Sequence, residues 1–143
     1  MTRKRALSRQ RLLKEGVGFH GHLGPYLVVG LRMGAIAIQR LKPRRLHELS
    51  ATVWTKKSPP QSCLLDGIQV SSGCTLGKGN IRVEDSRRTK VEFRKGGRTI
   101  TIEPSRKATI MLSRVSMGSP QLELKGIAVA LHRIPDRELL KVT

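Results

Sequence analysis

Apolar residues follow two different spacings along this chain, one helical and one alternating, and the change of spacing separates helices from strands. Residues 25–41 carry hydrophobic side chains almost all round a helix, which is typical of a helix buried on most sides. Gly24 and Pro25 suit its start, because proline at the first helical position lacks an N–H that would be unpaired anyway. A short amphipathic helix over residues 6–15, stopped by Gly16, is predicted before it.

A second core helix is predicted after Ser58-Pro59-Pro60-Gln61. Serine at a helix cap with glutamine three residues later is the pattern of a capping box, and proline again suits the first helical position. This helix is expected to start near Pro59 and to end before Gly73.

The middle of the chain has the alternation of a sheet. A short strand is predicted over residues 51–55, and three more follow a glycine-rich turn, residues 73–80, as a meander. Gly96-Gly97 is a strong two-residue hairpin signal. The remaining elements are strands over residues 80–84, 89–94 and 98–103, helices over 105–117 and 122–132, and a last helical turn over 135–140. The predicted class is α+β, with N-terminal helices, a mainly antiparallel sheet and C-terminal helices.

The length of 143 residues fits one domain. We divide it into a basic N-terminal helix or tail, residues 1–16, and one core, residues 17–143. The most apolar stretch, residues 23–41, is interrupted by Arg32 and other polar residues, so no membrane span is expected. The basic N-terminus lacks the apolar core of a secretory signal, and a cytoplasmic location is expected.

Positive charge dominates the composition. Lys and Arg number 28 against 10 Asp and Glu, for a net charge of +18 and a sequence pI near 11.4. Such a field attracts phosphates, anionic membrane surfaces or acidic partners, and nucleic acid is the obvious candidate. However, the basic residues are scattered, and aromatic residues, at 3%, offer almost no platform for stacking bases. A nucleic-acid-binding protein and a merely solvated cationic surface both remain open.

His20 and His22 lie in a predicted glycine-punctuated loop, residues 17–23, just before the buried helix. The positive end of a helix dipole disfavours the imidazolium, and neutral imidazole is the form that binds metals or acts as a base. Gly21 between them lets the backbone bend so that the two rings converge. Ordinary polar loop residues are the alternative interpretation.

Cys63 falls in the first turns of the second core helix, where unpaired N–H groups stabilise a thiolate. Asp66, three residues on, shares its side of the helix. Cys74 follows the helix, about three helical turns from Cys63, so the two thiols need not be close. In the cytosol such cysteines are expected as free thiols, metal ligands or redox groups, and a small buried hydrophobe is the alternative for Cys63.

The turn over residues 73–80 is not a P-loop, because the spacing of its glycines and the residue after Lys78 do not match that motif. Its backbone N–H groups and the Lys78 ammonium could hold a phosphate or carboxylate. It could equally be a simple turn with Lys78 in solvent.

Three motifs occur in order along the chain: Phe19-His20-Gly21-His22-Leu23-Gly24-Pro25, then Cys63-x-x-Asp66-Gly67-Ile68-Gln69, then Gly73-Cys74-Thr75-Leu76-Gly77-Lys78-Gly79-Asn80. Their order and spacing resemble the core domain of the FmdE family, named after the FmdE subunit of formylmethanofuran dehydrogenase, and the ending Ile134-Pro135-Asp136-x-Glu138-Leu139 matches less specifically. The resemblance implies an α+β core that can form an intertwined homodimer, with a metal site or pocket built from the three motifs.

The sequence also departs from the family pattern. Gly24 stands where the family usually has a cysteine, which removes one candidate ligand, and no cysteine follows Cys74, so only the core without a zinc-finger domain is expected. The family name refers to a subunit associated with molybdenum-dependent formylmethanofuran dehydrogenase, so a larger enzyme complex is a possible partner.

Our first hypothesis is a pocket that binds a transition metal, zinc first, since mixed N and S ligands suit zinc. The expected metal ligands are His20, His22, Cys63 and Cys74. The expected catalytic residues are Cys63, Asp66 and Lys78, and an anionic ligand would be held by Gln69, Thr75, Lys78 and Asn80.

Two other classes remain. One is a binding protein that uses its charge on nucleic acid. The other is a non-catalytic partner subunit that docks through the helix at residues 25–41, where Gly30 and Gly34 share a face and would allow close approach of a helix or a second subunit. Glycines that are merely tolerated there are the alternative.

Overall fold

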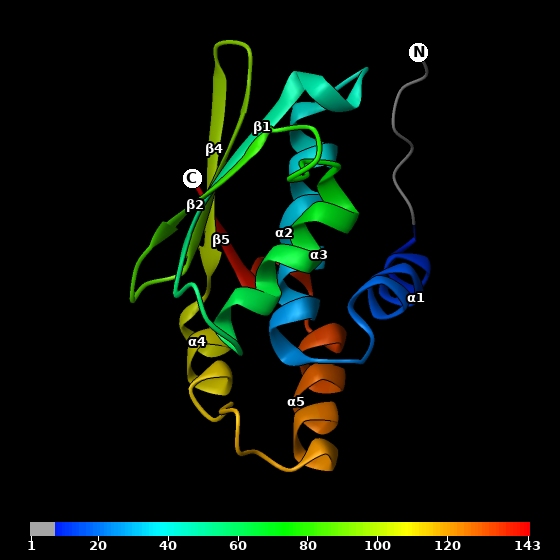
Figure 1. The fold of residues 1–143 in the computed structure, drawn as a ribbon, viewed down its shortest axis with the longest axis vertical. Helices are drawn as coiled ribbons and strands as arrows, with labels where there is room; N and C mark the ends of the chain where they lie inside the picture. The colour runs from blue at the N-terminus through cyan, green and yellow to red at the C-terminus, as the bar shows by residue number, and fades with distance from the viewer. Residues whose placement is uncertain (1–7) are drawn as a thin grey trace.

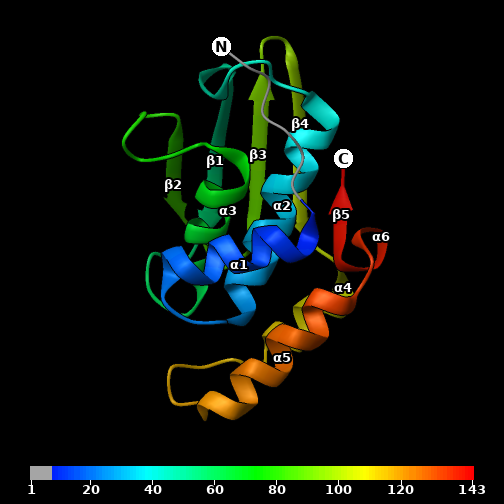
Figure 2. The same ribbon diagram turned by 90° about the vertical axis from the view of Figure 1, so that its right-hand side faces the viewer.

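The computed structural model describes residues 8–143 as a sheet with helices against one face (Figure 1). Helices α2 and α3 lie against the sheet, α1 lies beyond them, and α4 and α5 lie past one end, as the turned view also shows (Figure 2). The α+β class is therefore confirmed. The elements are α1 (Arg9–His20), α2 (Pro25–Leu41), η1 (Leu46–Glu48), β1 (Leu49–Thr55), η2 (Gln61–Cys63), α3 (Leu64–Ser72), β2 (Ile81–Asp85), β3 (Lys90–Lys95), β4 (Arg98–Pro104), α4 (Arg106–Leu112), α5 (Gln121–Arg133), α6 (Asp136–Leu139) and β5 (Leu140–Val142).

The sheet has five strands in the order β2-β1-β3-β4-β5 and is mainly antiparallel. The predicted meander is wrong in one respect: β2 does not pair with β3, because β1 lies between them and pairs with β2 in parallel. A parallel pair needs a crossover, and α3 supplies it between β1 and β2. The β3–β4 hairpin at Gly96-Gly97 is as predicted, whereas the short edge strand β5 was not foreseen.

The core lies between the sheet and α2. Along β1 the inward residues Leu49, Ala51 and Val53 are buried, while the residues between them face outward. Phe93 and Met33 are fully buried between the two layers. Alternate burial of this kind leaves one sheet face open to solvent. Among residues 8–143, no helix has the length and apolar character needed to cross a bilayer.

Helices α2 and α3 touch backbone to backbone through small residues. A Cβ added to Gly30 would collide with the carbonyl oxygen of Leu64, and one added to Gly34 would collide with the Ser71 hydroxyl. Ser71 Oγ donates to the carbonyl oxygen of Gly67 at 2.8 Å, within the same helix. The close approach expected at Gly30 and Gly34 is therefore made, and the helix that makes it is α3.

Helix α1 is longer than the sequence pattern predicts. Gly16 does not stop it: this glycine is buried, and a Cβ there would meet the Leu31 side chain at 2.7 Å. The stop is Gly21, which takes the left-handed conformation with φ 101° and closes the helix through its N–H on the carbonyl of Val17. Residues 17–20, expected in a loop, are thus helical. Ser8 caps the N-terminus, and residues 6 and 7 of the predicted helix lie outside the described part of the chain.

The second core helix begins later than predicted. The predicted capping box at Ser58 is wrong, since residues Gln61–Cys63 form a 3₁₀ turn and α3 starts at Leu64 with no side-chain capping bond. Ser58 contributes its backbone carbonyl, which accepts the N–H of Ser62 at 3.1 Å. Gly73 ends the helix in the left-handed conformation, as expected. Toward the C-terminus, α5 agrees with its prediction, while α4 ends at Leu112, before the predicted limit of 117.

Candidate functional site

His20 is the last residue of α1 and faces α3. Its Nδ1 lies 2.5 Å from Oδ2 of Asp66, which stands in the first turn of α3. The His20 side chain is 9% exposed, whereas that of Asp66 is 34% exposed. The placement corrects one premise, because His20 lies at the negative C-terminal end of α1 as well as ahead of α2. The charged group nearest to its ring is the Asp66 carboxylate, which an expectation based on the helix dipole alone does not include.

The other ring nitrogen of His20 is orphaned. Its Nε2 is buried and has no hydrogen-bond partner among residues 8–143. When Nδ1–H donates to a carboxylate, Nε2 of the neutral ring carries the lone pair. A buried lone pair without a partner is uncommon and points to a ligand or a chemical role. His20 is therefore held in orientation by Asp66, with its second nitrogen available.

His22 lies beside this pair but is exposed. The two imidazole ring centroids are 4.5 Å apart with planes tilted by 37°, so the predicted convergence of the rings is present. A Cβ built on Gly24 would stand 3.4 Å from His22 Nε2. Gly24 thus adjoins the histidines.

Cys63 occupies the N-cap position of α3 and is partly buried. Burial raises the pKa of its thiol, and the negative charge of Asp66 raises that pKa further. From its place in the sequence, the helix N-terminus was expected to stabilise a thiolate. That expectation is wrong in direction, because desolvation and the nearby carboxylate outweigh the helix end.

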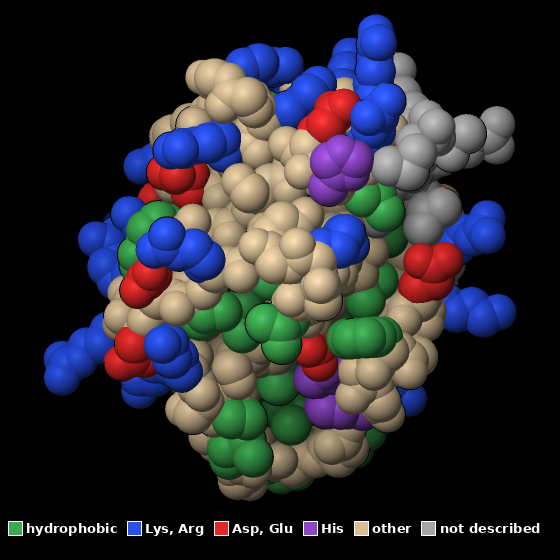
Figure 3. All heavy atoms as spheres, turned by 45° about the horizontal axis from the view of Figure 1, so that its top comes forward, with side chains coloured by type: hydrophobic (Ala, Val, Ile, Leu, Met, Phe, Trp, Pro, Cys, Tyr) green, Lys and Arg blue, Asp and Glu red, His purple; other side chains and the backbone are tan. Residues whose placement is uncertain are grey.

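Two cavities meet at His20 and Cys63. One, of about 350 Å³, lies between the start of α2 and the segment ahead of α5; the other, of about 580 Å³, lies between α3 and β2. His20, Pro59 and Cys63 line both. Figure 3 shows histidine and acidic side chains together on one face, surrounded by hydrophobic ones. The first cavity is completed by residues that no sequence motif indicated: Tyr26, Pro60, Val115, Met117, Gln121 and Leu124.

Cys74 is not part of this arrangement. It is fully buried in the hydrophobic core, and its Sγ donates to the carbonyl of Leu49 at 3.5 Å. It lines neither cavity. The structure thus brings together His20, His22, Cys63 and Asp66 and leaves the second thiol apart. Within residues 8–143, no group of three or more His, Cys, Asp and Glu side chains is already arranged to hold a metal ion.

The predicted anion-binding residues hold the 73–80 turn in shape. Asn80 Oδ1 accepts the N–H of Thr75 at 2.8 Å, and its Nδ2 donates to the carbonyl of Leu49 at 2.9 Å. Lys78 Nζ donates to Thr75 Oγ1 at 3.1 Å. Gln69 Oε1 accepts the N–H of Leu76 at 3.0 Å, and Gln69 also lines the larger cavity. The polar groups of the turn mostly serve the turn itself, and an anion-binding role stays a prediction.

The chain is an α+β protein with a five-stranded sheet. Its candidate ligand site is the histidine–carboxylate pair that α1 and α3 carry at the junction of two cavities. The model of the family described as "FmdE, Molybdenum formylmethanofuran dehydrogenase operon" matches residues 19–140. The chain therefore belongs to the FmdE family.

Two relatives extend this finding. The chain is 36% identical over 74 residues to a probable S-adenosyl-L-methionine-binding protein of Archaeoglobus fulgidus, a match that covers 50% of this chain and 20% of the relative, so the chain matches about a fifth of that protein's length. It also resembles the crystal structure of a tungsten formylmethanofuran dehydrogenase FmdE-like protein from Syntrophus aciditrophicus. The TM-score is 0.67 at 21% identity, over 100% of this chain and 76% of that one, which supports the fold.

Proposed function

We propose that this FmdE-family chain is a ligand-binding protein whose site is the His20–Asp66 pair and whose ligand is a transition metal, zinc first. The observation that carries the proposal is the buried Nε2 of His20, which has no partner among the described residues while Nδ1 is held by a carboxylate. Metal-bound histidines usually donate their second N–H to a carboxylate or carbonyl, which fixes the ring orientation and raises its basicity. His20 has this arrangement before any metal is added.

The remaining donors fit zinc in chemistry. His22 and Cys63 line a cavity together with His20, and imidazole and thiolate are the ligands zinc prefers. Three protein ligands would leave one position of a tetrahedral site for a small molecule, at which bound zinc supplies Lewis acidity. Cys74 lies in the core, so the proposal uses His20, His22 and Cys63 and omits it. Asp66 acts by positioning His20.

Metal titration of the purified chain tests this proposal. Zinc binding by calorimetry and thiolate-to-metal absorption on cobalt loading should both be lost in His20→Ala and Cys63→Ala. His47→Ala is the matched control, because His47 is exposed and lies outside both cavities. Asp66→Asn should weaken binding by about 10- to 100-fold, as loss of such an outer partner generally does. Equal affinity in His20→Ala and the control would refute the metal site.

The proposal extends to partners. Family membership supports a link to formylmethanofuran dehydrogenase, and the resemblance to the FmdE core supports an intertwined homodimer. Light scattering on the purified chain gives the oligomeric state, and co-purification from native extract tests the larger complex.

The name of the archaeal relative makes S-adenosyl-L-methionine the organic ligand to include in the same calorimetry. It would compete with the metal at the cavities that His20 lines.

A further inference from the structure

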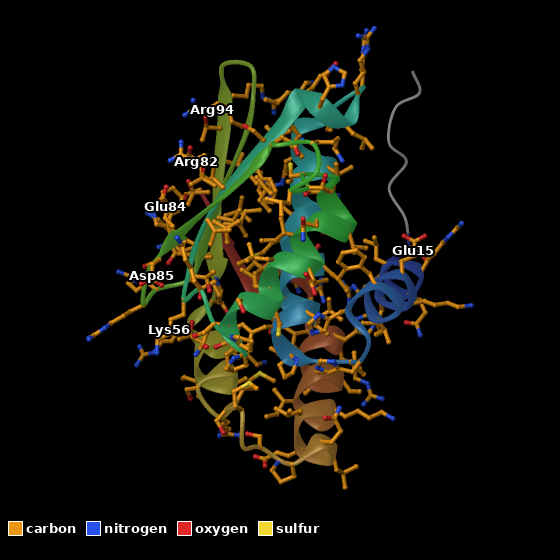
Figure 4. All side chains as sticks on the ribbon, in the orientation of Figure 1. Glu15, Lys56, Arg82, Glu84, Asp85 and Arg94 are labelled. Carbon is orange, nitrogen blue, oxygen red and sulfur yellow. The ribbon has the colours of Figure 1, made fainter. Side chains whose placement is uncertain are left out.

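The charges on the open face of the sheet are largely compensated. Arg82 pairs with Glu84 at 2.8 Å within β2, and Arg94 pairs with Glu92 at 3.5 Å within β3. Figure 4 shows Arg82, Glu84 and Arg94 on the side of the sheet that faces away from the helices. Since each of these arginines has an acidic neighbour, the pairs contribute nothing to the net charge of +18.

The basic residues at one end of the sheet are also accompanied by acids. Arg88 lies 3.6 Å from Glu103, and the backbone N–H of Lys57 donates to Asp85 at 3.3 Å. Four cations, Lys56, Lys57, Arg87 and Arg88, therefore have two acids beside them, Asp85 and Glu103, because Glu84 is already paired with Arg82.

The opposite end of the molecule is different. There the β3–β4 hairpin is tied to the C-terminus of α2: Lys95 Nζ donates to the carbonyls of Leu41 and Lys42, both at 3.1 Å, and Arg98 Nη2 donates to that of Arg40 at 3.1 Å. Two cations thus neutralise the negative end of the α2 dipole. We call this region the basic end and define it by Arg40, Lys42, Arg44, Arg45, Lys95 and Arg98.

The other four cations of the basic end have exposed side chains, and none of them forms an ion pair within residues 8–143. They are Arg40, Lys42, Arg44 and Arg45. Glu48 is the acid of this loop, where it accepts the backbone N–H of Arg44 at 3.1 Å, and it offsets one positive charge of the basic end. Figure 3, in which this end comes forward, shows Lys and Arg side chains gathered along its top.

From this asymmetry we infer that the basic end binds the phosphate backbone of double-stranded nucleic acid. Phosphate contacts need only well-placed cations, and arginine presents a fork that matches phosphate oxygens.

The aromatic side chains of the sheet lie elsewhere. Trp54 is on the open sheet face beneath Lys90, and Phe93 is in the core, so neither offers stacking for unpaired bases at this end. Leu46, 38% exposed, is the large apolar side chain exposed in this loop, which is too little to insert into a bilayer.

The surface is separate from the His20 site. Helix α2 has 17 residues and therefore spans about 25 Å, with the histidines at its N-terminal end and the basic end at the other. Nucleic-acid binding and metal binding can consequently be lost independently of one another.

Fluorescence anisotropy with a labelled duplex of about 20 base pairs tests the inference. With four phosphates neutralised, log affinity should fall with log salt at a slope of about −3.6, which is roughly a 150-fold loss between about 50 and 200 mM salt. The variant Arg40→Gln, Lys42→Asn, Arg44→Gln, Arg45→Gln should lose most of that slope. Asparagine is chosen at position 42 because Lys42 has φ 48°, a conformation that asparagine tolerates.

A matched control removes the same number of charges from the other end, where Asp85 and Glu103 offset part of the charge, through Lys56→Gln, Lys57→Gln, Arg87→Gln and Arg88→Gln, and its slope should change by less than about one unit. If the first variant does not fold, Arg44→Gln with Arg45→Gln should lose about half of the slope. Equal losses in variant and control, or no duplex binding at the lower salt concentration, would overturn the inference. So would polyglutamate or anionic-lipid vesicles that bind as tightly as the duplex, since the partner would then be an acidic protein or a membrane.

Discussion

Replacing Gly30 with alanine should destabilise the protein, although alanine is the better helix former. The added methyl would collide with the carbonyl oxygen of Leu64 and stand 3.2 Å from Cα of Gly67, so α2 and α3 would have to move apart. Alanine gains roughly 1 kcal/mol of helix propensity. Overpacking costs about 1–3 kcal/mol in general and more where the obstacle is main chain. We expect a net loss of about 1–2 kcal/mol or more.

Gly18 is the matched control for this substitution. It too lies inside a helix, α1, but a Cβ there meets nothing within 4 Å. Gly18→Ala should therefore keep the full gain of roughly 1 kcal/mol. The two variants make the same chemical change and should shift stability in opposite directions.

Urea unfolding followed by circular dichroism measures both variants, and for a domain of this size about 1 kcal/mol also moves the melting temperature by roughly 3–4 °C. Because α3 carries Asp66 and Cys63 caps it, Gly30→Ala should weaken metal binding as well, whereas Gly18→Ala should not. A Gly30→Ala protein as stable as the unsubstituted chain would refute the close helix contact on which the site geometry depends.

Three further outcomes are expected. Gly24→Cys should raise zinc affinity in calorimetry, because a Cβ there lies 3.4 Å from His22 Nε2; unchanged affinity would speak against a metal beside the histidines. Burial lowers the pKa of His132, and nearby arginines led by Arg32 lower it further, so the folded protein favours the neutral imidazole. The free energy of unfolding should therefore fall as pH drops below the ordinary histidine pKa. Melting temperatures measured over a pH series should depend less on pH in His132→Gln, and an equally steep dependence would contradict this. Arg32→Met should cost about 2–3 kcal/mol in urea unfolding, since it removes charged hydrogen bonds to Asp136 at 2.7 Å and to the carbonyl of Ile134 at 2.6 Å; the exposed Arg133→Met is the control, and equal effects would disprove the role.

Patterns that depend on the local chain predicted most of the fold. The buried helix α2, the Gly73 stop and the β3–β4 hairpin follow from periodicity and turn residues that act within a few positions. The errors arose where distant parts of the chain decide. Gly16 resembles a helix stop, but this glycine serves contact with Leu31, and no local signal shows that β1 would insert between β2 and β3.

The same distinction holds for the site. The linked motifs contain His20, Cys63 and Asp66, which the fold brings together although 46 positions separate His20 from Asp66. Sequence could not show that Cys74 turns into the core, or that burial and Asp66 would raise the pKa of the Cys63 thiol. Arg32 was interpreted only as an interruption of an apolar stretch. Its three acceptors lie about a hundred residues away, so its role as an anchor for the C-terminal segment is visible only in three dimensions.

The imidazole of the site is carried by α1, which stands outside the layer formed by α2, α3 and the sheet. Its hold on the rest of the protein includes Leu12, Gly16 and the bond from His20 to Asp66. If α1 detaches in a local opening, the site loses His20 while the sheet and its covering helices persist. A ligand that bridges His20 and α3 binds only when α1 is docked, so its binding free energy stabilises the docked helix. Ligand binding should therefore slow amide hydrogen exchange along α1.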